Sequence, residues 1–443
     1  MRTLFANAYV VTMDDAGTEL ANGWILVEDG FVEQVGEGNP PPAEAFENLA
    51  GALVTPGLVN THHHLYQTLT RTRAQQADLF TWLRTLYPLW SRVDRDSEYA
   101  AARTGLAALA LGGCTTAFDH HYVFPPGRTG LVEAEIQAAR ELGLRLVASR
   151  GSMDVGESDG GLPPDDLVED ADDVLADVEG LSALHEPDPG AWTQIVVAPC
   201  SPFSVSKRLM GESAELARRL GLRLHTHLAE TVEEEEYCRG LFGCRPVEYL
   251  EQVGWLEDDV WCAHCVHLNE EDVRTFGSSR VGVAHCPTSN MRLGAGIAPV
   301  AQMRSATVPV GLGVDGSASN ERGDLLFEVK QALLSARAVG GPAAMTPREA
   351  LWIGTRGGAQ VLGRRDIGSL EPGKCADFAV WRTDGLEFAG ADDLVAGLVL
   401  SAPHRVDRLY VGGQAVVRDG HLTHAEEHEI AAEHRLQAQR FLA

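Results

Sequence analysis

The 443-residue chain lacks several features that would place it in a membrane or on a nucleic acid. It contains no apolar run of about 18 residues, so we expect no membrane span. Its first residues, MRTLFANAYVVTMDD, lack the apolar stretch of a signal peptide, which favours a cytoplasmic location. Basic residues number 36 against 63 acidic ones, and the formal net charge is −27. Such a surface repels phosphate backbones and anionic membranes.

The chain contains few lysines and a moderate number of cysteines. The three lysines are Lys207, Lys330 and Lys374. The eight cysteines are expected to be reduced in a cytoplasmic protein. Cys262 and Cys265 form one Cys-x-x-Cys pair, but no second pair follows, and on a strand this spacing puts the two thiols on opposite faces. We therefore expect structural cysteines, and the alternative is a redox or zinc protein built on this pair.

Eight apolar segments with strand character alternate with helical segments, which predicts an α/β fold with a (β/α)₈ TIM-like barrel. The eight segments are GLVNTHHH, CTTAFDHH, LRLVASRG, QIVVAPCS, LRLHTHLAE, VWCAHCVH, VGVAHCP and VPVGLGVDG. Short strands with Gly-rich turns occur at both ends of the chain, which predicts a small composite β-sandwich domain. The predicted bounds are 1–56 with 364–443 for the β domain and 57–363 for the barrel.

Two further segments have a less specific pattern. Residues 156–170, GESDGGLPPDDLVED, form a Gly-, Pro- and Asp-rich loop after the third barrel strand, and composition leaves a lid and a solvated connection both open. The run Glu233–Glu236 is predicted to be a solvated helix face.

Histidines follow the strand ends, where the active sites of such barrels lie. His62 and His64 are two residues apart and therefore share one face, whereas His63 points away. His225 and His227 share a face in the same manner, and Glu230 follows them. Near another strand end His264 is a candidate for chemistry.

Asp315 lies between glycines after the eighth strand and is either the centre of an Asx turn or a further ligand. Together His62, His64, His227 and Asp315 form a His₃Asp set around one barrel mouth. This set suits one divalent metal, zinc or alternatively iron(II). With a water as the remaining ligand, the metal would supply hydroxide at neutral pH. The fourth strand contains no lysine that could bridge two metals, so we predict one metal.

At this point the sequence resembles the amidohydrolase superfamily, in its mononuclear deaminase branch, over nearly the whole chain. The matching pieces are PGLVNTHHH, HTHLAE, AHCVH, HCPTSNMRLGAGIAPV, GVDGSASN and GSLEPGKCADFAVW. The resemblance implies the same four metal ligands. It also implies that Glu230 shuttles protons, that Asp315 takes part in the proton transfers, and that His264 contacts water and substrate. The family further suggests a homo-oligomer.

Within this branch the chain looks like the 8-oxoguanine deaminase group. The pieces that carry this likeness are HHHLYQTLTR, TTAFDHHYVFP, RGSMDVGESDGGLPPD and APCSPFSVS. The likeness implies hydrolytic deamination of 8-oxoguanine to urate and ammonia, with the Gln67 amide holding a ring carbonyl. Trp82 is either a wall for a flat heterocycle or an ordinary helix-packing residue. Pro199-Cys200-Ser201 stands where guanine deaminases place an arginine, which disfavours guanine.

Other substrates and one other class of protein remain open. Isoxanthopterin and s-triazines of the hydroxyatrazine type belong to neighbouring groups, and Glu230 supports deamination because a leaving nitrogen must be protonated. The alternative of another class is a metal-binding barrel without catalysis, which would need neither Glu230 nor His264.

Overall fold

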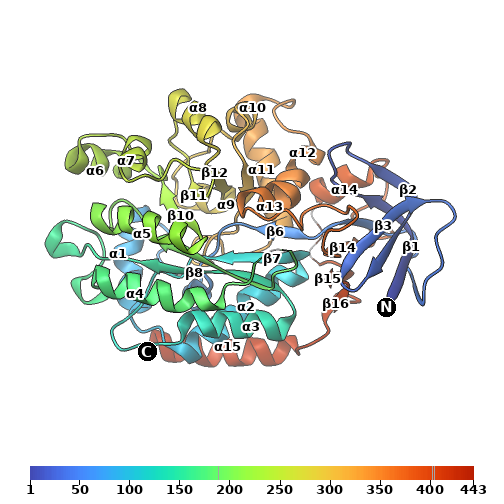
Figure 1. The fold of residues 1–443 in the computed structure, drawn as a ribbon, viewed down its shortest axis with the longest axis horizontal. Helices are drawn as coiled ribbons and strands as arrows, with labels where there is room; N and C mark the ends of the chain where they lie inside the picture. Colours follow the sequence, from blue (N-terminus) through green and yellow to red (C-terminus); the bar gives the residue numbers. More distant parts are fainter. Residues whose placement is uncertain (188, 402, 404) are drawn as a thin grey trace.

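The computed structural model describes residues 1–187, 189–401, 403 and 405–443. It contains a closed barrel of eight parallel strands and, beside it, a sheet built from both ends of the chain (Figure 1). The predicted fold class is confirmed. No helix in the described part of the chain is long and apolar enough to cross a bilayer.

The barrel strands follow one another in chain order around the barrel, and β13 closes onto β6 through Leu312 and Asn60. All eight predicted segments contain a barrel strand. The strands are β6 (Leu58–Asn60), β7 (Cys114–Asp119), β8 (Arg145–Ser152), β9 (Thr193–Pro199), β10 (Arg223–Leu228), β11 (Val260–His264), β12 (Gly282–His285) and β13 (Val310–Leu312). Every one of these residues is buried except Gln194 and Arg223, as expected for parallel strands covered by helices.

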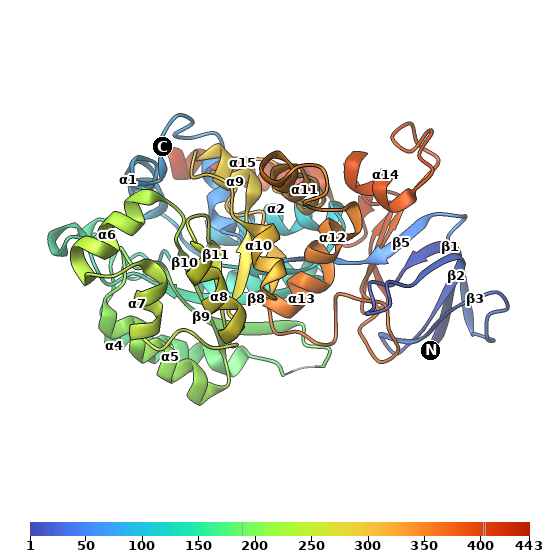
Figure 2. The same cartoon turned by 90° about the horizontal axis from the view of Figure 1, so that it is seen from above.

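Helices cover the outside of the barrel and form short extensions at its mouth (Figure 2). The α-helices up to the middle of the chain are α1 (Leu79–Trp90), α2 (Arg95–Leu111), α3 (Leu131–Leu142), α4 (Ala171–Leu181), α5 (Lys207–Leu220), α6 (Val232–Phe242) and α7 (Pro246–Gln252). The later ones are α8 (Glu270–Ser279), α9 (Pro287–Arg292), α10 (Val300–Ser305), α11 (Leu325–Gly340), α12 (Pro347–Trp352), α13 (Gly358–Val361), α14 (Leu394–Ser401) and α15 (Glu427–Leu442). The 3₁₀ turns are η1 (Leu65–Thr70), η2 (Glu157–Asp159), η3 (Asp165–Leu167) and η4 (Ser182–Leu184), and η5 (Ile353–Gly357) is a π-helical turn.

The second sheet joins the two ends of the chain, as predicted. Its strands are β1 (Arg2–Val11), β2 (Glu19–Glu28), β3 (Phe31–Glu37), β4 (Ala45–Asn48), β5 (Leu53–Pro56), β14 (Phe378–Trp381), β15 (Arg408–Val411), β16 (Gln414–Arg418) and β17 (His421–Leu422). The junction is the antiparallel pair of β5 and β14. Because β5 leads directly into β6, this pairing ties the sheet to the first barrel strand.

The carboxyl-terminal helix α15 lies against the barrel rather than on the second sheet (Figure 1). Arg92 donates to the carbonyl of Phe441 at 2.9 Å, and Arg103 pairs with Glu433 at 2.7 Å. The side chains of Ile430 and Phe441 are buried. The predicted domain bounds stay a prediction, and α15 is an element within 364–443 that contacts the barrel.

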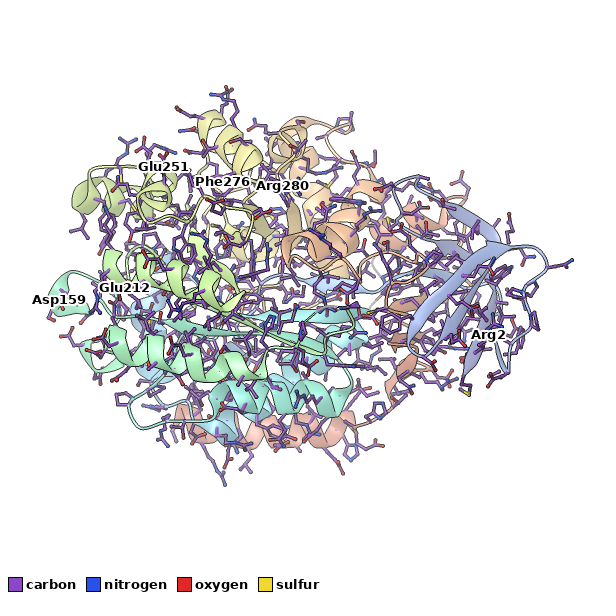
Figure 3. The ribbon with its side chains drawn as sticks, in the orientation of Figure 1. Arg2, Asp159, Glu212, Glu251, Phe276 and Arg280 are labelled. Atoms are coloured by element: carbon purple, nitrogen blue, oxygen red, sulfur yellow. The ribbon has the colours of Figure 1, made fainter. Side chains whose placement is uncertain are left out.

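The loop at residues 156–170 is anchored by apolar side chains. Leu162 and Leu167 are buried, and the Asp165 carboxylate accepts the backbone N–H of Ser158 at 3.0 Å. Figure 3 places Asp159, in this loop, at the end of the molecule opposite Arg2 on β1. The loop therefore lies on the side of the barrel away from the second sheet.

The two parts of the chain are joined by a buried ion pair. Arg145 on β8 holds Asp377, just before β14, through Nε at 2.7 Å and Nη2 at 3.1 Å, and both side chains are almost completely buried. A bidentate pair of this kind is strong when intact, and removing one partner leaves the other charge buried.

We expect Asp377→Ala to lower the free energy of unfolding by about 3–5 kcal/mol, because the Arg145 guanidinium loses its counter-charge. Urea unfolding followed by tryptophan fluorescence measures this change. Asp384→Ala, which removes an exposed partner of Arg382, is the matched control and should leave the unfolding midpoint unchanged. Equal effects of the two substitutions would contradict the importance of the buried pair.

Candidate active site

The carboxyl ends of the barrel strands bring the predicted residues together. β6 ends at Asn60, and the next residues stay extended, with the His62 carbonyl accepting the N–H of Asp315 at 3.0 Å. The alternation therefore continues past the strand, so His62 and His64 face inward. His63 points the other way, toward Gly105 on α2. This arrangement confirms the face alternation expected from the sequence.

Two imidazoles have their tautomer fixed by a backbone carbonyl. The Nδ1 atom of His64 lies 2.7 Å from the carbonyl oxygen of His120, and Nδ1 of His227 lies 2.7 Å from the carbonyl oxygen of Cys200. Because a carbonyl only accepts, both Nδ1 atoms carry the proton. The Nε2 atoms of His64 and His227 are therefore lone-pair donors, and they face each other at 3.1 Å.

The third imidazole is fixed through a neighbour. His225 Nδ1 lies 3.0 Å from the carbonyl oxygen of Trp261 and must carry a proton, so its Nε2 accepts. His62 Nδ1 lies 3.0 Å from that Nε2 and is consequently the donor. His62 Nε2 is left as a lone pair, and it has no hydrogen-bond partner among the described residues. His225 thus has a defined role, which the sequence did not reveal.

Asp315 completes the set. Its Oδ1 lies 3.5 Å from Nε2 of His62 and 3.4 Å from Nε2 of His64. Ligands at about 2.0–2.1 Å from a tetrahedral zinc are separated by about 3.3–3.4 Å, so these spacings match the edges of such a coordination shell. Facing lone pairs at 3.1 Å repel unless a cation lies between them. The four side chains fit a divalent metal.

The charge states also fit a metal. Burial lowers the pKa of His62, His64 and His227, which keeps the rings neutral. Burial alone would raise the pKa of Asp315, but the surrounding imidazoles, His62 first among them, bring it well below its usual value. Neutral imidazole and ionised carboxylate are the forms that bind metals.

His264 and Glu230 lie beside this set. His264 Nε2 is 3.5 Å from Glu230 Oε2 and 3.9 Å from Asp315 Oδ2, while its Nδ1 pairs with Asn290 Oδ1 at 2.9 Å. Burial raises the pKa of Glu230 to about 7, against the opposing effect of His264. A carboxyl group near neutrality is suited to both taking and giving a proton.

The prediction for Glu233–Glu236 is wrong for one member. Glu234 is buried, and its two carboxylate oxygens accept the backbone N–H groups of Ala229 and Glu230 at 2.7 and 2.9 Å. Those groups follow the end of β10 and have no strand partner there, so the carboxylate replaces the missing acceptors. Glu234 thereby positions the Glu230 backbone.

Backbone strain occurs at the same residues. Asp315 has a φ of 63° and His264 a φ of 72°. Both values lie in the left-handed region, which residues other than glycine rarely adopt. Such strain persists only where the surroundings hold it, and it is concentrated at functional sites.

The set opens into a narrow cavity of about 30 Å³. Apolar side chains form much of its wall, among them Leu79, Leu83, Phe203 and Leu293. None of the described residues that line it is Lys or Arg. Gln67 lines the cavity, and neither of its amide atoms has a hydrogen-bond partner in the described part of the chain. A Cβ on Gly316 would lie 1.8 Å from Gln67 Oε1, so a side chain there would displace this amide. Trp82 lines the same cavity, while its Nε1–H donates to the Ala318 carbonyl at 3.3 Å.

His120 is a neighbour that the prediction did not include. It lies on the inward face after β7, and its ring stacks on His227 with the ring centres 4.7 Å apart. Its Nδ1 has no partner among the described residues, and it lies within the same group of imidazoles. In the segment CTTAFDHH, Phe118 and His120 are two residues apart and share the inward face of the strand. This alternation could have identified His120 from the sequence.

The cysteine pair has a different geometry from that expected. β11 ends at His264, and Cys265 has a φ of 51°, so its sulfur turns back to 3.9 Å from the Cys262 carbonyl oxygen. Both thiols are free and fully buried, and burial raises the pKa of Cys265 well above its usual value. The pair is therefore structural and unreactive.

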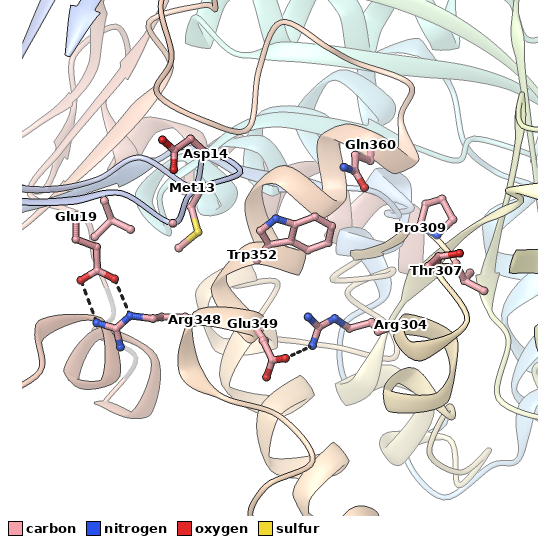
Figure 4. Close-up of a pocket in the computed structure, with 13 residues that line it drawn as sticks. Met13, Asp14, Glu19, Arg304, Thr307, Pro309, Arg348, Glu349, Trp352 and Gln360 are labelled. Carbon is pink, nitrogen blue, oxygen red and sulfur yellow. Dashed lines mark hydrogen bonds and ion pairs between the residues drawn. The ribbon is translucent and has the colours of Figure 1, made fainter. Parts of the chain in front are cut away.

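A wider cleft of about 440 Å³ lies between the first strands and α12 (Figure 4). Val308 and Pro309 line it just before β13, so it lies at the amino ends of the barrel strands, away from the histidines. Its charged side chains are paired, Arg348 with Glu19 and Arg304 with Glu349.

Comparison with known proteins agrees with this geometry. The model of the Amidohydrolase family matches residues 53–416. The chain is 47% identical to the 8-oxoguanine deaminase of Pseudomonas aeruginosa over 96% of each chain. It is 36% identical to an isoxanthopterin deaminase from an unknown prokaryotic organism, over 98% of this chain and 96% of that one. The solved structure of an atrazine chlorohydrolase from Arthrobacter aurescens TC1, complexed with zinc, superimposes with a TM-score of 0.95 at 33% identity, covering 98% and 100% of the chains.

We expect His225→Phe to weaken metal binding about 10–100-fold, because His62 Nδ1–H loses the acceptor that fixes its tautomer. Competition with a chelator of known affinity measures this change. His63→Gln, in the same His-His-His run but facing away, is the control and should keep the metal. Unchanged metal affinity in His225→Phe would contradict the inference that the Trp261 carbonyl, acting through His225, fixes the tautomer of His62.

Proposed function

The chain belongs to the amidohydrolase family, and we propose that it deaminates 8-oxoguanine to urate and ammonia. It is a hydrolase that acts on carbon–nitrogen bonds of cyclic amidines. The observation that carries the chemistry is the convergence of three Nε2 lone pairs and the Asp315 carboxylate beside Glu230. The similarity to 8-oxoguanine deaminase and the absence of Lys and Arg from the residues that line the cavity support the substrate.

In this proposal His62, His64, His227 and Asp315 hold one divalent metal. The ligand set suits zinc, with iron(II) as the alternative. When bound, the metal lowers the pKa of its water toward about 7 and so provides a nucleophile at neutral pH. The zinc complex of the related atrazine chlorohydrolase supports the choice of zinc.

The proton transfers fall to Glu230, His264 and Asp315. Glu230 takes a proton from the attacking water and gives it to the ring nitrogen beside the amino-bearing carbon. His264, held by Asn290, directs its Nε2 toward Glu230 and the substrate. Asp315 and Glu230 then pass the remaining proton to the amino group. The new carbon–oxygen bond replaces the carbon–nitrogen bond, and ammonia leaves.

Gln67 and Trp82 orient the ring in this proposal. The Gln67 amide offers an N–H donor and a carbonyl acceptor to the edge of the heterocycle, and neither atom has another partner. Trp82 provides a wall of the cavity. Because no cationic side chain is among the residues that line the cavity, a neutral base fits better than a nucleotide, whose phosphate would lack a counter-charge.

Isoxanthopterin is the second candidate, and the 36% identity to an isoxanthopterin deaminase favours it. A triazine aminohydrolase activity would use the same metal and the same acid. The enzyme is proposed to work on this small molecule in the cytoplasm as a homo-oligomer, with neither nucleic acid nor membrane as a partner.

We expect Glu230→Gln to retain the metal and to lower kcat by about 10²–10⁴-fold, because the amide cannot relay the proton. Metal content and steady-state kinetics are measured on the same preparation. Glu233→Gln, at an exposed position of the same segment, is the control with normal turnover. Ordinary turnover in Glu230→Gln would remove Glu230 from the proton relay.

The substrate proposal is tested by ammonia release and ultraviolet change with the metal-loaded enzyme. 8-Oxoguanine, isoxanthopterin, guanine and hydroxyatrazine are compared, and we expect the highest kcat/KM for 8-oxoguanine. A higher value for isoxanthopterin or hydroxyatrazine would keep the metal chemistry and overturn the account of Gln67. No ammonia from any of the four, with metal bound, would overturn the substrate class.

A further inference from the structure

We propose that Glu98, His121 and Glu135, beside Asp119, form a second divalent-cation site outside the barrel. We call these four residues the outer cluster. Glu98 lies on α2, Glu135 on α3, and Asp119 and His121 at the end of β7. One ligand atom each from Glu98, His121 and Glu135 lies within 4.8 Å of the others.

The outer cluster follows from the alternation along β7. His120 faces into the barrel, so Asp119 and His121 face outward, toward the helices that cover this strand. Glu98 and Glu135 face back from α2 and α3. All four side chains are fully buried, so the outer cluster lies between the barrel wall and these two helices.

The tautomer of His121 makes its Nδ1 a lone-pair donor. Nε2 lies 2.9 Å from the carbonyl oxygen of Val123 and must carry a proton, and burial lowers the pKa of His121, so the ring is neutral and Nδ1 has no proton. Nδ1 then faces Glu135 Oε1 at 2.9 Å and Glu98 Oε2 at 3.6 Å. A lone pair and carboxylate oxygens at these distances repel one another unless a positive charge lies between them.

The atoms of the outer cluster lack partners. Among the described residues, both oxygens of Glu98, both oxygens of Glu135, Asp119 Oδ2 and His121 Nδ1 have no hydrogen-bond donor outside the cluster itself. Nor does any of the three carboxylates pair with a lysine or arginine in the described part of the chain. Buried carboxylates are costly unless they are paired or coordinate a metal, and a cation would satisfy several of these atoms at once.

The ligand chemistry indicates a transition metal. Two carboxylates and one imidazole suit Mn²⁺ or Zn²⁺, whereas Ca²⁺ and Mg²⁺ prefer oxygen ligands alone. Cation–ligand distances of about 2.0–2.2 Å place neighbouring ligand atoms about 3 Å apart, as observed for His121 Nδ1 and Glu135 Oε1. The other way to satisfy these atoms is to bind protons, since burial raises the pKa of Glu135 to about 8.

This site would support the active site from behind. Asp119 Oδ1 accepts the backbone N–H of Leu65 at 2.6 Å, and the Tyr66 ring packs edge-on against the His121 ring. Leu65 and Tyr66 connect His64 to Gln67. A cation in the outer cluster would therefore fix the turn that carries a metal ligand and a substrate contact, although it would touch neither.

The test counts metal in the full-length enzyme, loaded with Mn²⁺ or Zn²⁺ and passed through gel filtration. We expect two divalent ions per chain in the wild type and one in the double variant Glu98→Gln with Glu135→Gln. Glu133→Gln, at an exposed position on α3, is the matched control and should keep two. Calorimetric titration with Mn²⁺ should show the same difference in sites.

A second variant keeps the test decisive if the first fails to fold. His64→Ala with His227→Ala removes the barrel-mouth ligands and should retain one ion, which would then lie in the outer cluster. The proposal is overturned if the wild type binds one ion and that variant none. It is also overturned if the Glu98 and Glu135 double variant still binds two. Metal counts leave the deaminase proposal untouched, because activity is not the readout.

Discussion

The interaction on which this structure depends is the repulsion among three imidazole lone pairs held at one point. Carbonyl oxygens of His120, Cys200 and, through His225, Trp261 fix the Nδ1 protons, so the Nε2 atoms cannot satisfy one another. Without a cation this arrangement would strongly destabilise the folded state. Closure of the barrel brings the strand ends to one mouth, and the pairing of β5 with β14 anchors the first of those strands.

Around that point the protein places acids in three different environments. Asp315 stays ionised because imidazoles surround it, whereas burial keeps Glu230 near neutrality and ready to exchange a proton. Glu234 performs no chemistry and instead replaces backbone acceptors. In the proposed reaction a carboxylate thus binds a metal, carries a proton or shapes a turn according to what its oxygens meet. The left-handed backbone at Asp315 and His264 is a local cost of that placement.

Much of this could be predicted from the sequence, because it depends on local periodicity. Strand alternation gave the eight strands and the inward faces of His62, His64 and His227, and both chain ends showed the turn-rich pattern of the second sheet. The rest depends on distant contacts. His225 acquires its role from the Trp261 carbonyl, Glu234 is hidden in a run of four glutamates, and α15 has too few apolar residues to reveal that it docks on α2. The outer cluster could not be predicted because its residues come from α2, α3 and the end of β7, which meet only in the folded protein.

The most direct test of the central claim is an anomalous difference map at the zinc edge from crystals of the zinc-loaded enzyme. The account predicts a peak about 2.0–2.2 Å from Nε2 of His62, His64 and His227 and from an Asp315 oxygen. A map without density at this position, or with zinc bound through an Nδ1 atom, would contradict the tautomer chain and the chemistry built on it.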